Sequence, residues 1–246
     1  MVRQSANPHM NPPVSESGRF DLISATVGAQ LPDWLRGVEW SQLPTDRKIV
    51  ALTFDAGSGA QGVPPILSTL NSTGVPGTFF LTGRWIEQYP GPAQQIAASP
   101  TNVIGNHSYD HPYFTQLTTD QIDQEVVSTE NLIETKTDRY PRPIFRFPYG
   151  DSDSTCVADV NRLGYGSIRW TVDTLDWKGA STGQSVATIR QRVLNGLRPG
   201  EIVLMHVGAA DDGTTLDADA LPYVIADLEA LGYGFVDVWN FSLGNA

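Results

Sequence analysis

Cysteine and clusters of positive charge are the scarcest features of this sequence. Cys156 is the single cysteine among 246 residues, so the chain cannot form an internal disulfide framework. Lysine and arginine number 16 against 27 acidic residues, they form no run, and the formal net charge is −11. A chain of this composition does not follow a phosphate backbone, so nucleic acid is excluded as the expected partner.

Long apolar runs are also missing. No stretch approaches the roughly 18 consecutive apolar residues of a transmembrane helix, so no membrane span is expected. The N-terminus lacks the basic and then apolar pattern of a signal peptide, although a chain that has lost its signal would look the same.

The first 45 residues differ from the rest of the chain. Residues 1 to about 18 are rich in Pro, Ser and Asn, which predicts a flexible leader. Residues 19–45 carry Leu31, Trp34, Leu35 and Trp40 between prolines and are expected to pack irregularly. The remaining segment, 46–246, is long enough for one large domain with a substantial core.

Short apolar runs alternate with helical patterns from Lys48 onward. This alternation predicts an α/β fold with a parallel sheet, most simply a distorted (β/α) barrel of about seven strands. Residues 118–135 give the clearest helix, because Thr118 and Gln121 form a capping box. The other helices are expected near 64–72, 85–98, 154–163, 184–197 and 219–231, and the strands at 49–54, 78–81, 102–105, 144–145, 167–172, 202–205 and 235–238.

Polar side chains follow five of these strands at the point where each strand ends. They are Asp55, His107, Arg146, Asp173 and His206. In a barrel the loops after the strands converge on one mouth, so this repetition predicts a shared site.

Histidine is rare and clustered. Of the four histidines, His107 and His111 are four residues apart, His206 ends an apolar run, and His9 lies in the predicted leader. Imidazole is the commonest protein metal ligand and titrates near neutral pH, so the His107/His111 pair indicates a site for one divalent metal. The spacing alone favours a pair of solvated or hydrogen-bonded loop histidines, and it is the context of the pair that favours the metal site.

Five short segments occur in a characteristic order. They are Thr53-Phe54-Asp55, His107-Ser108-x-x-His111, Arg146-x-Pro148-Tyr149-Gly150, Asp173-x-x-Asp176-Trp177 and Leu204-x-His206. In order and spacing they resemble the five motifs of polysaccharide deacetylases, carbohydrate esterase family four. The resemblance extends from about Lys48 to Val238 and implies that residues 46–246 are a catalytic domain.

The resemblance implies metal-dependent hydrolysis of an acetyl group on a carbohydrate polymer. Zinc, or cobalt, would be held by His107 and His111, and Asp55 would be the general base. Arg146 would pair with Asp55, and His206 would be the general acid, with Asp176 orienting it and raising its pKa. A simple salt bridge for Arg146 and a core histidine for His206 are the structural alternatives.

Three further residues are implied to contact substrate. The backbone N–H of Tyr149 would stabilise the oxyanion, next to a close backbone approach at Gly150. Trp177 and Leu204 resemble the walls of an apolar pocket for the acetyl methyl group, with ordinary core packing as the competing interpretation. Neither a serine-hydrolase elbow at Gly57-Ser58-Gly59 nor a nucleophilic Cys156 is supported.

The sequence departs from the family at Ala56, where the family has a metal-binding aspartate. A methyl group cannot coordinate a cation, so the expected site is reduced to two histidines. Asp55 could move onto the metal, waters could complete the coordination, or a carboxylate among Asp110, Asp151 and Asp153 could substitute. Asp110 is sterically unfavourable as a ligand because it lies between the two histidines in the sequence.

The leading hypothesis is therefore a metal-dependent deacetylase of an acetylated polysaccharide or oligosaccharide. Peptidoglycan, a chitin-type glycan and acetylated xylan all fit the motifs, and this substrate class implies a secreted or cell-envelope protein. The alternatives are a carbohydrate-binding relative that has lost the metal ligand at Ala56 and turns nothing over, and a metal-dependent hydrolase of a small amide on the same scaffold.

Overall fold

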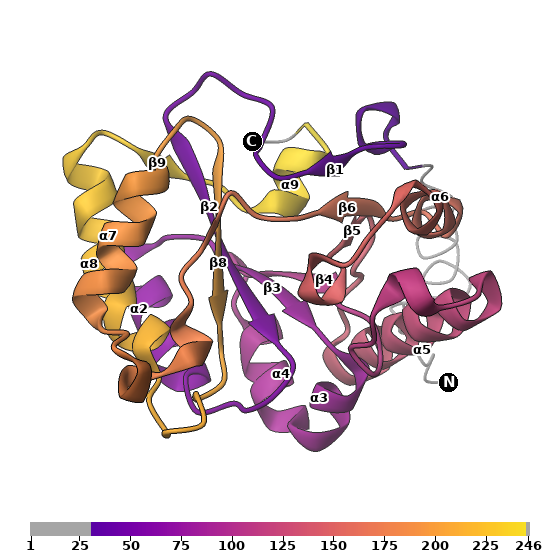
Figure 1. The fold of residues 1–246 in the computed structure, drawn as a ribbon, viewed down its shortest axis with the longest axis horizontal. Coiled ribbons are helices and arrows are strands. Elements are labelled where there is room, and N and C mark those ends of the chain that lie inside the picture. Colours follow the sequence, from indigo (N-terminus) through magenta and orange to yellow (C-terminus); the bar gives the residue numbers. More distant parts are fainter. Residues whose placement is uncertain (1–30, 245–246) are drawn as a thin grey trace, which may run out of the picture. The chain divides into compact units, whose positions relative to one another are not determined.

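One curled parallel sheet with helices around it forms the described part of the chain, residues 31–244 of a computed structural model (Figure 1). Its nine strands run in the order β1-β6-β5-β4-β3-β2-β8-β7, with β9 paired to β2. The strands are β1 (Glu39–Trp40), β2 (Ile49–Ala56), β3 (Thr78–Leu81), β4 (Val103–Asn106), β5 (Ile144–Phe145), β6 (Gly166–Ile168), β7 (Val172–Asp173), β8 (Glu201–His206) and β9 (Gly234–Phe235). The predicted α/β barrel architecture is confirmed, with nine strands described where about seven were expected.

The helices follow the strands as the alternating pattern predicts, and the capping box at Thr118 and Gln121 is present. In Figure 1, α7 and α8 lie side by side, and they are in contact. The helices are α2 (Val63–Thr73), α3 (Gly83–Gln88), α4 (Pro90–Ala98), α5 (Thr119–Thr137), α6 (Ser154–Arg162), α7 (Val186–Gly196), α8 (Leu216–Ala230) and α9 (Val238–Ser242). Short 3-10 turns are η1 (Asp33–Leu35), η2 (Phe114–Gln116), η3 (Pro148–Gly150), η4 (Asp176–Lys178) and η5 (Ala180–Thr182). None of the helices among residues 31–244 is both long and apolar enough to cross a bilayer.

The central strand β2 separates two layers of the core. All eight of its residues are buried, and successive side chains point to opposite faces. Val50, Leu52, Phe54 and Ala56 belong to a large apolar cluster with residues of α2 and α8. Ile49 and Ala51 belong to a second cluster inside the curl of the sheet. Asp55 therefore faces the inside of the barrel, whereas the methyl group of Ala56 packs in the helix-covered layer.

The N-terminal segment contributes an edge strand. Within residues 31–45, β1 pairs with β6, and Gln42 forms an isolated antiparallel bridge with Glu201 of β8. The sheet thus curls so that the segment after its edge strand β1 contacts β8, near the opposite edge. The predicted flexible leader, residues 1 to about 18, and the predicted irregular residues 19–30 lie outside the described part of the chain.

The predicted single strand over 167–172 is wrong. The chain forms β6, leaves it at Arg169, and forms β7 beside β8 on the other side of the barrel opening. The N–H of Arg169 still donates to Trp40 O of β1 at 2.8 Å, whereas the N–H of Thr171 donates to Ile202 O of β8 at 2.8 Å. An apolar run shows that residues are buried but not which strand they pair with, so the change of partner was invisible in the sequence.

Two other predicted elements are shorter than expected. The helix expected over 85–98 is divided at Tyr89, because a residue before proline avoids the helical region and Pro90 starts a new helix. The strand expected over 235–238 ends at Phe235. Asp237 then caps α9 by accepting a hydrogen bond from the N–H of Asn240 at 2.7 Å.

A buried carboxyl group at the start of β8 makes the stability of the fold depend on pH. Burial raises the pKa of Glu201 to about 7, although the backbone and charge of Arg198 oppose the shift. The folded protein holds this proton more tightly than the unfolded chain. The stabilisation from the proton is therefore fully present below the ordinary glutamate pKa of 4.5 and is lost as pH rises through about 7.

We expect Glu201→Gln to reduce this loss. Between about pH 5 and pH 8 the wild type should lose on the order of 3 kcal/mol more unfolding free energy than the variant. Urea titrations at both pH values measure the difference. Glu229→Gln, an exposed position on α8, is the matched control. An equal pH dependence in Glu201→Gln and wild type would contradict the assignment.

Candidate active site

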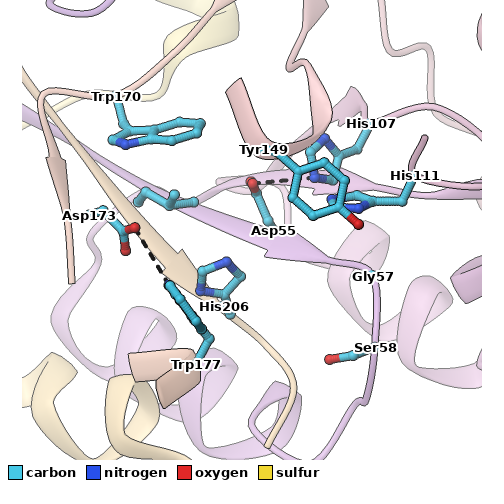
Figure 2. Close-up of a pocket in the computed structure, with 11 residues that line it drawn as sticks. Asp55, Gly57, Ser58, His107, His111, Tyr149, Trp170, Asp173, Trp177 and His206 are labelled. Carbon is cyan, nitrogen blue, oxygen red and sulfur yellow. Dashed lines mark hydrogen bonds and ion pairs between the residues drawn. The ribbon is translucent and has the colours of Figure 1, made fainter. Parts of the chain in front are cut away.

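Four of the five polar residues predicted at strand ends, all but the fully buried Arg146, line one cavity of about 480 Å³ (Figure 2). Six different strands (β2, β4, β5, β6, β7 and β8) or the loops after them contribute to it, as expected for the carboxyl end of a parallel barrel. The cavity is lined by Asp55, Gly57, Ser58, His107, His111, Tyr149, Trp170, Asp173, Trp177, Leu204 and His206.

Asp55 is held as a directed carboxylate at the end of β2. Its Oδ1 accepts a hydrogen bond from Arg146 Nη1 at 2.7 Å, and its Oδ2 lies 3.4 Å from His107 Nε2. Burial alone would raise the pKa of Asp55, but the positive charge and hydrogen bond of Arg146, together with the charge of His206, lower it below its usual value. Asp55 is therefore ionised, with Oδ2 turned toward His107.

Arg146 is fixed on several sides. Its side chain is fully buried, its Nε donates to Ile168 O at 3.2 Å, and its Nη2 donates to Arg169 O at 3.0 Å. The guanidinium also lies over the ring of Phe80, 4.2 Å from the ring centroid. The predicted pairing with Asp55 is present, and these bonds set the direction in which Asp55 points.

The two histidines of the pair are neutral. His107 Nδ1 lies 2.8 Å from Arg146 O, and because a carbonyl only accepts, Nδ1 carries the proton and Nε2 keeps its lone pair. Burial lowers the pKa of His107 and lowers that of His111 to about 3, where His107 adds to the effect. The ring centroids are 4.8 Å apart. Neutral imidazoles with available lone pairs are the form that binds a metal.

The loop that carries the histidines is held by side chains of neighbouring elements. Asn106 Oδ1 accepts from the N–H of Ser108 at 3.0 Å, and Glu125 Oε2 accepts from the N–H groups of Tyr109 and Asp110 at 2.8 Å each. Ser108 and His111 adopt positive φ values of 68° and 59°. Three hydrogen bonds from loop N–H groups to Asn106 and Glu125 thus stabilise a backbone conformation that non-glycine residues rarely adopt. Ser108 also accepts from the N–H of His111, as expected of a bracing residue.

The carboxylates considered as a third metal ligand are engaged elsewhere. Asp110 is paired with Arg84, Asp151 accepts from the N–H and hydroxyl of Thr115, and Asp153 caps α6. None of the three lines the cavity. The donor set therefore fits a divalent d-block cation through His107 and His111, with Asp55 or water as further ligands.

His206 ends β8 and lies beside Asp55 in the sheet register. Its Nδ1 lies 2.7 Å from Asp176 Oδ1, which leaves Nε2 for the cavity. Burial would lower the pKa of His206, but its hydrogen bond to Asp176 and the charges of Asp176, Asp55 and Asp173 raise it above its usual value. This is the protonation behaviour that a general acid requires.

Asp217, at the start of α8, adjoins this pair. Among residues 31–244, Asp176, His206 and Asp217 form one group of three potential metal ligands whose atoms lie within 4.8 Å of one another. His206 Nδ1 and Asp176 Oδ1 are 2.7 Å apart, which is the length of a direct charge-assisted hydrogen bond. In this structure His206 Nδ1 and Asp176 Oδ1 are therefore bonded to each other. The sequence did not reveal Asp217, because an acid in the first turn of a helix is ordinary.

The predicted substrate-contacting residues lie around the cavity. Tyr149 adopts a φ of 58°, and its exposed ring stacks on Tyr113 with centroids 4.4 Å apart. Trp177 is 52% exposed, which argues against core packing, whereas Leu204 is buried and lines the cavity. Trp170 also lines the cavity and was not predicted, because its apolar run looked like an ordinary strand.

Comparison with known proteins agrees with this site. The family model described as polysaccharide deacetylase matches residues 42–168. A peptidoglycan-N-acetylglucosamine deacetylase of Bacillus cereus is 34% identical over 78% of this chain and 68% of its own length. The solved Bacillus subtilis PdaA, a family 4 carbohydrate esterase, is 26% identical, with a TM-score of 0.76 over 100% of this chain and 98% of that one.

A third similar structure belongs to a variant of a pseudoenzyme. It is a mutant, with restored enzymatic activity, of a family 4 carbohydrate esterase pseudoenzyme from Bacillus anthracis. It is 33% identical to this chain, with a TM-score of 0.72, over 80% of this chain and 68% of that one. From the ordered motifs, the barrel and the match over 42–168, the chain belongs to the polysaccharide deacetylase family, carbohydrate esterase family four.

Proposed function

We propose that this protein removes acetyl groups from a polymer of the cell envelope by metal-dependent hydrolysis. The observation that carries the proposal is the arrangement of one cavity. Asp55, which is paired with Arg146, and His206, which is paired with Asp176, both line it, as do neutral His107 and His111. An ionised base and a protonated acid at one cavity are what amide hydrolysis requires.

His107 and His111 would hold the cation. When bound there, it would polarise the acetyl carbonyl and acidify a water molecule. Asp55 would accept the proton of that water while Arg146 keeps the carboxylate in place. The backbone N–H of Tyr149 would donate to the developing oxyanion. His206 Nε2 would give its proton to the leaving nitrogen, so that water and the acetylated amine become acetate and free amine.

The surroundings of the cavity support a sugar polymer as substrate. Trp177 and Leu204 would wall the acetyl methyl group. Tyr113 and Tyr149 expose 49% and 56% of their surface next to the cavity. Aromatic faces of this kind pack against the apolar C–H face of a pyranose ring. Relatives named as peptidoglycan deacetylases make N-acetylated peptidoglycan the first substrate to test, before chitin-type glycans and acetylated xylan.

Acetate release tests the proposal. Purified protein should release acetate from peptidoglycan or N-acetylated oligosaccharides with added Zn²⁺ or Co²⁺, and a chelator should abolish the activity. Asp110→Asn is the matched control, because that carboxylate pairs with Arg84 outside the cavity, and it should leave turnover and metal content unchanged.

The second candidate function is a carbohydrate-binding relative without catalysis, which Ala56 and the pseudoenzyme relative favour. Retained glycan binding without acetate release under any metal would establish that alternative. Acetate from small acetamides but not from glycans would instead indicate an amide hydrolase on the same scaffold.

A further inference from the structure

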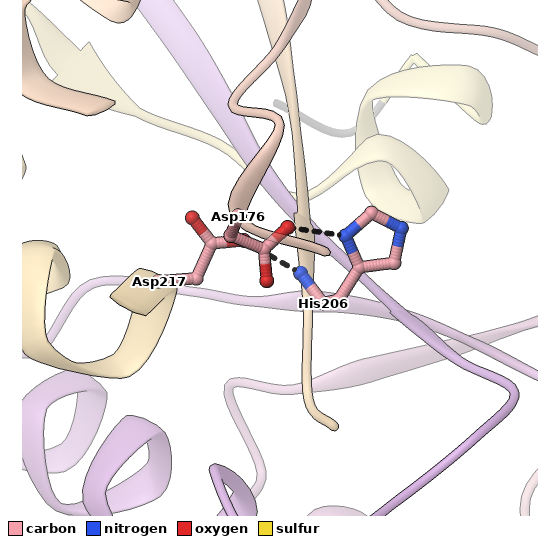
Figure 3. A group of neighbouring side chains, drawn as sticks. All are labelled: Asp176, His206 and Asp217. Carbon is pink, nitrogen blue, oxygen red and sulfur yellow. Dashed lines mark hydrogen bonds and ion pairs between the residues drawn. The ribbon is translucent and has the colours of Figure 1, made fainter. Parts of the chain in front are cut away.

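Two carboxyl groups, Asp176 and Asp217, each form a hydrogen bond with His206 (Figure 3). His206 Nδ1 is bonded to Asp176 Oδ1 at 2.7 Å, and Asp217 Oδ2 accepts from the backbone N–H of His206 at 2.8 Å. The hydroxyl of Thr174 lies 3.1 Å from the same Asp217 oxygen. Asp217 thus contacts the main chain of His206 while Asp176 contacts its ring.

The surroundings of the other oxygen, Asp217 Oδ1, indicate whether this carboxyl group is protonated. Asp217 is 1% exposed, and its Oδ1 is buried without a donor among the described residues. An ionised Asp217 would place an unpaired anionic oxygen beside the Asp176 carboxylate, which is costly in a buried site. A proton on Oδ1 removes that conflict because it can be donated to Asp176. Burial and the neighbouring Asp176 raise the pKa of Asp217 well above its usual range, in agreement with the neutral form.

We propose that neutral Asp217 is a positioning residue for the general acid, donating a hydrogen bond to Asp176 while accepting one from the His206 backbone. The inference rests on the proposed function, in which His206 Nε2 protonates the leaving nitrogen. Asp176 and Asp217 then share one negative charge between them. Asp176 remains the anionic partner of His206, and the ring and main chain of His206 are fixed by adjacent carboxyl groups.

Two substitutions test whether the hydrogen bonds of Asp217 or its negative charge matter. Asp217→Asn keeps an acceptor for the His206 N–H and replaces the carboxyl O–H by an amide donor of the same shape. Asp217→Leu keeps the branched outline of the side chain, with a somewhat larger volume, and removes both the acceptor and the donor. Asp219→Leu, an exposed acid two residues further along α8, is the matched control. Asp217→Ala is a smaller second variant in case Leu does not fold.

Turnover on an N-acetylated oligosaccharide gives the first readout. Asp217→Asn should retain kcat within about threefold of wild type, whereas Asp217→Leu or Ala should lower kcat at least about tenfold with little change in KM. Asp219→Leu should behave as wild type. A wild-type kcat in both Leu and Ala would overturn the proposal. An equal loss in Asn and Leu would also overturn it, because the ionised carboxylate, for example as a metal ligand, would then be required.

A second readout is independent of turnover. The downfield proton resonance of His206 Nδ1–H, assigned by its loss in His206→Gln, should persist in Asp217→Asn and move or broaden in Asp217→Leu or Ala. An unchanged resonance in all variants would overturn the positioning role. Should wild type release no acetate, the proposed function fails, while this resonance still decides the contact between Asp217 and the His206–Asp176 pair.

Discussion

Placing an aspartate at position 56 is expected to tighten metal binding by about ten- to a hundredfold, because it returns an anionic ligand to a site with two neutral imidazoles. Residue 56 lies next to Gly57, and a Cβ on Gly57 would be 3.9 Å from the His111 ring. The backbone just after residue 56 is therefore close to His111. The wild-type methyl group, however, packs in the helix-covered apolar layer.

The same substitution should lower the stability of the metal-free protein. A carboxylate in that apolar layer loses its hydration without gaining a partner, which costs several kcal/mol unless a cation pairs with it. Metal should therefore raise the melting temperature of Ala56→Asp much more than that of wild type. Metal titration by calorimetry and thermal melts with and without chelator measure both effects.

Ala56→Asn is the matched control for charge, since its amide has the shape of the carboxylate but does not neutralise the cation. It should share the loss of stability and gain little metal affinity. Equal affinities in wild type and Ala56→Asp would show that residue 56 does not reach the metal, and the family alignment at this position would then need revision.

The second large effect is expected for His206→Ala. Loss of a general acid typically costs about 10²–10⁴ in rate, and because the imidazole acts on the leaving group, kcat should fall with little change in KM. The loss should be much smaller on an aryl acetate, whose leaving group needs no proton. Comparing the two substrates separates acid catalysis from a general distortion of the cavity.

The pH profile of wild type gives an independent check on His206. Because the folded-state pKa of His206 is raised, the acid remains protonated above its ordinary value of 6.5, and activity is lost as pH rises through the higher value. The residual activity of His206→Ala should not show this decrease at alkaline pH. Equal decreases in kcat of His206→Ala on the amide and the aryl acetate, together with an unchanged decrease of activity at alkaline pH, would show that another group donates the proton.

Much of the barrel could be predicted from the sequence because it depends on local patterns. Buried strands such as β2 and β8 are continuous apolar runs, and α5 carries its own capping signal at Thr118. The strand ends predicted Asp55, His107, Arg146 and His206 as neighbours, because parallel strands end on the same side of a sheet.

Features that depend on contacts between distant segments were not predictable. The break between β6 and β7 follows from a change of pairing partner, and the place of Asp217 follows from the way α8 packs against β8 and η4. Likewise, the sequence allowed Asp110, Asp151 or Asp153 as a metal ligand. Only the structure shows that each already has a hydrogen-bond or ion-pair partner.

The bracing of the histidine loop by Asn106, Ser108 and Glu125 bears on how the proposed metal site would acquire a cation. Because these side chains order the loop within the folded chain, its conformational entropy is lost during folding and not at the moment of metal binding. In the proposed site, capture of a cation would then require neither a folding step nor a rearrangement of the backbone. The histidine loop is preorganised, and the selectivity of the proposed site among cations would follow from donor chemistry and the fixed spacing of His107 and His111.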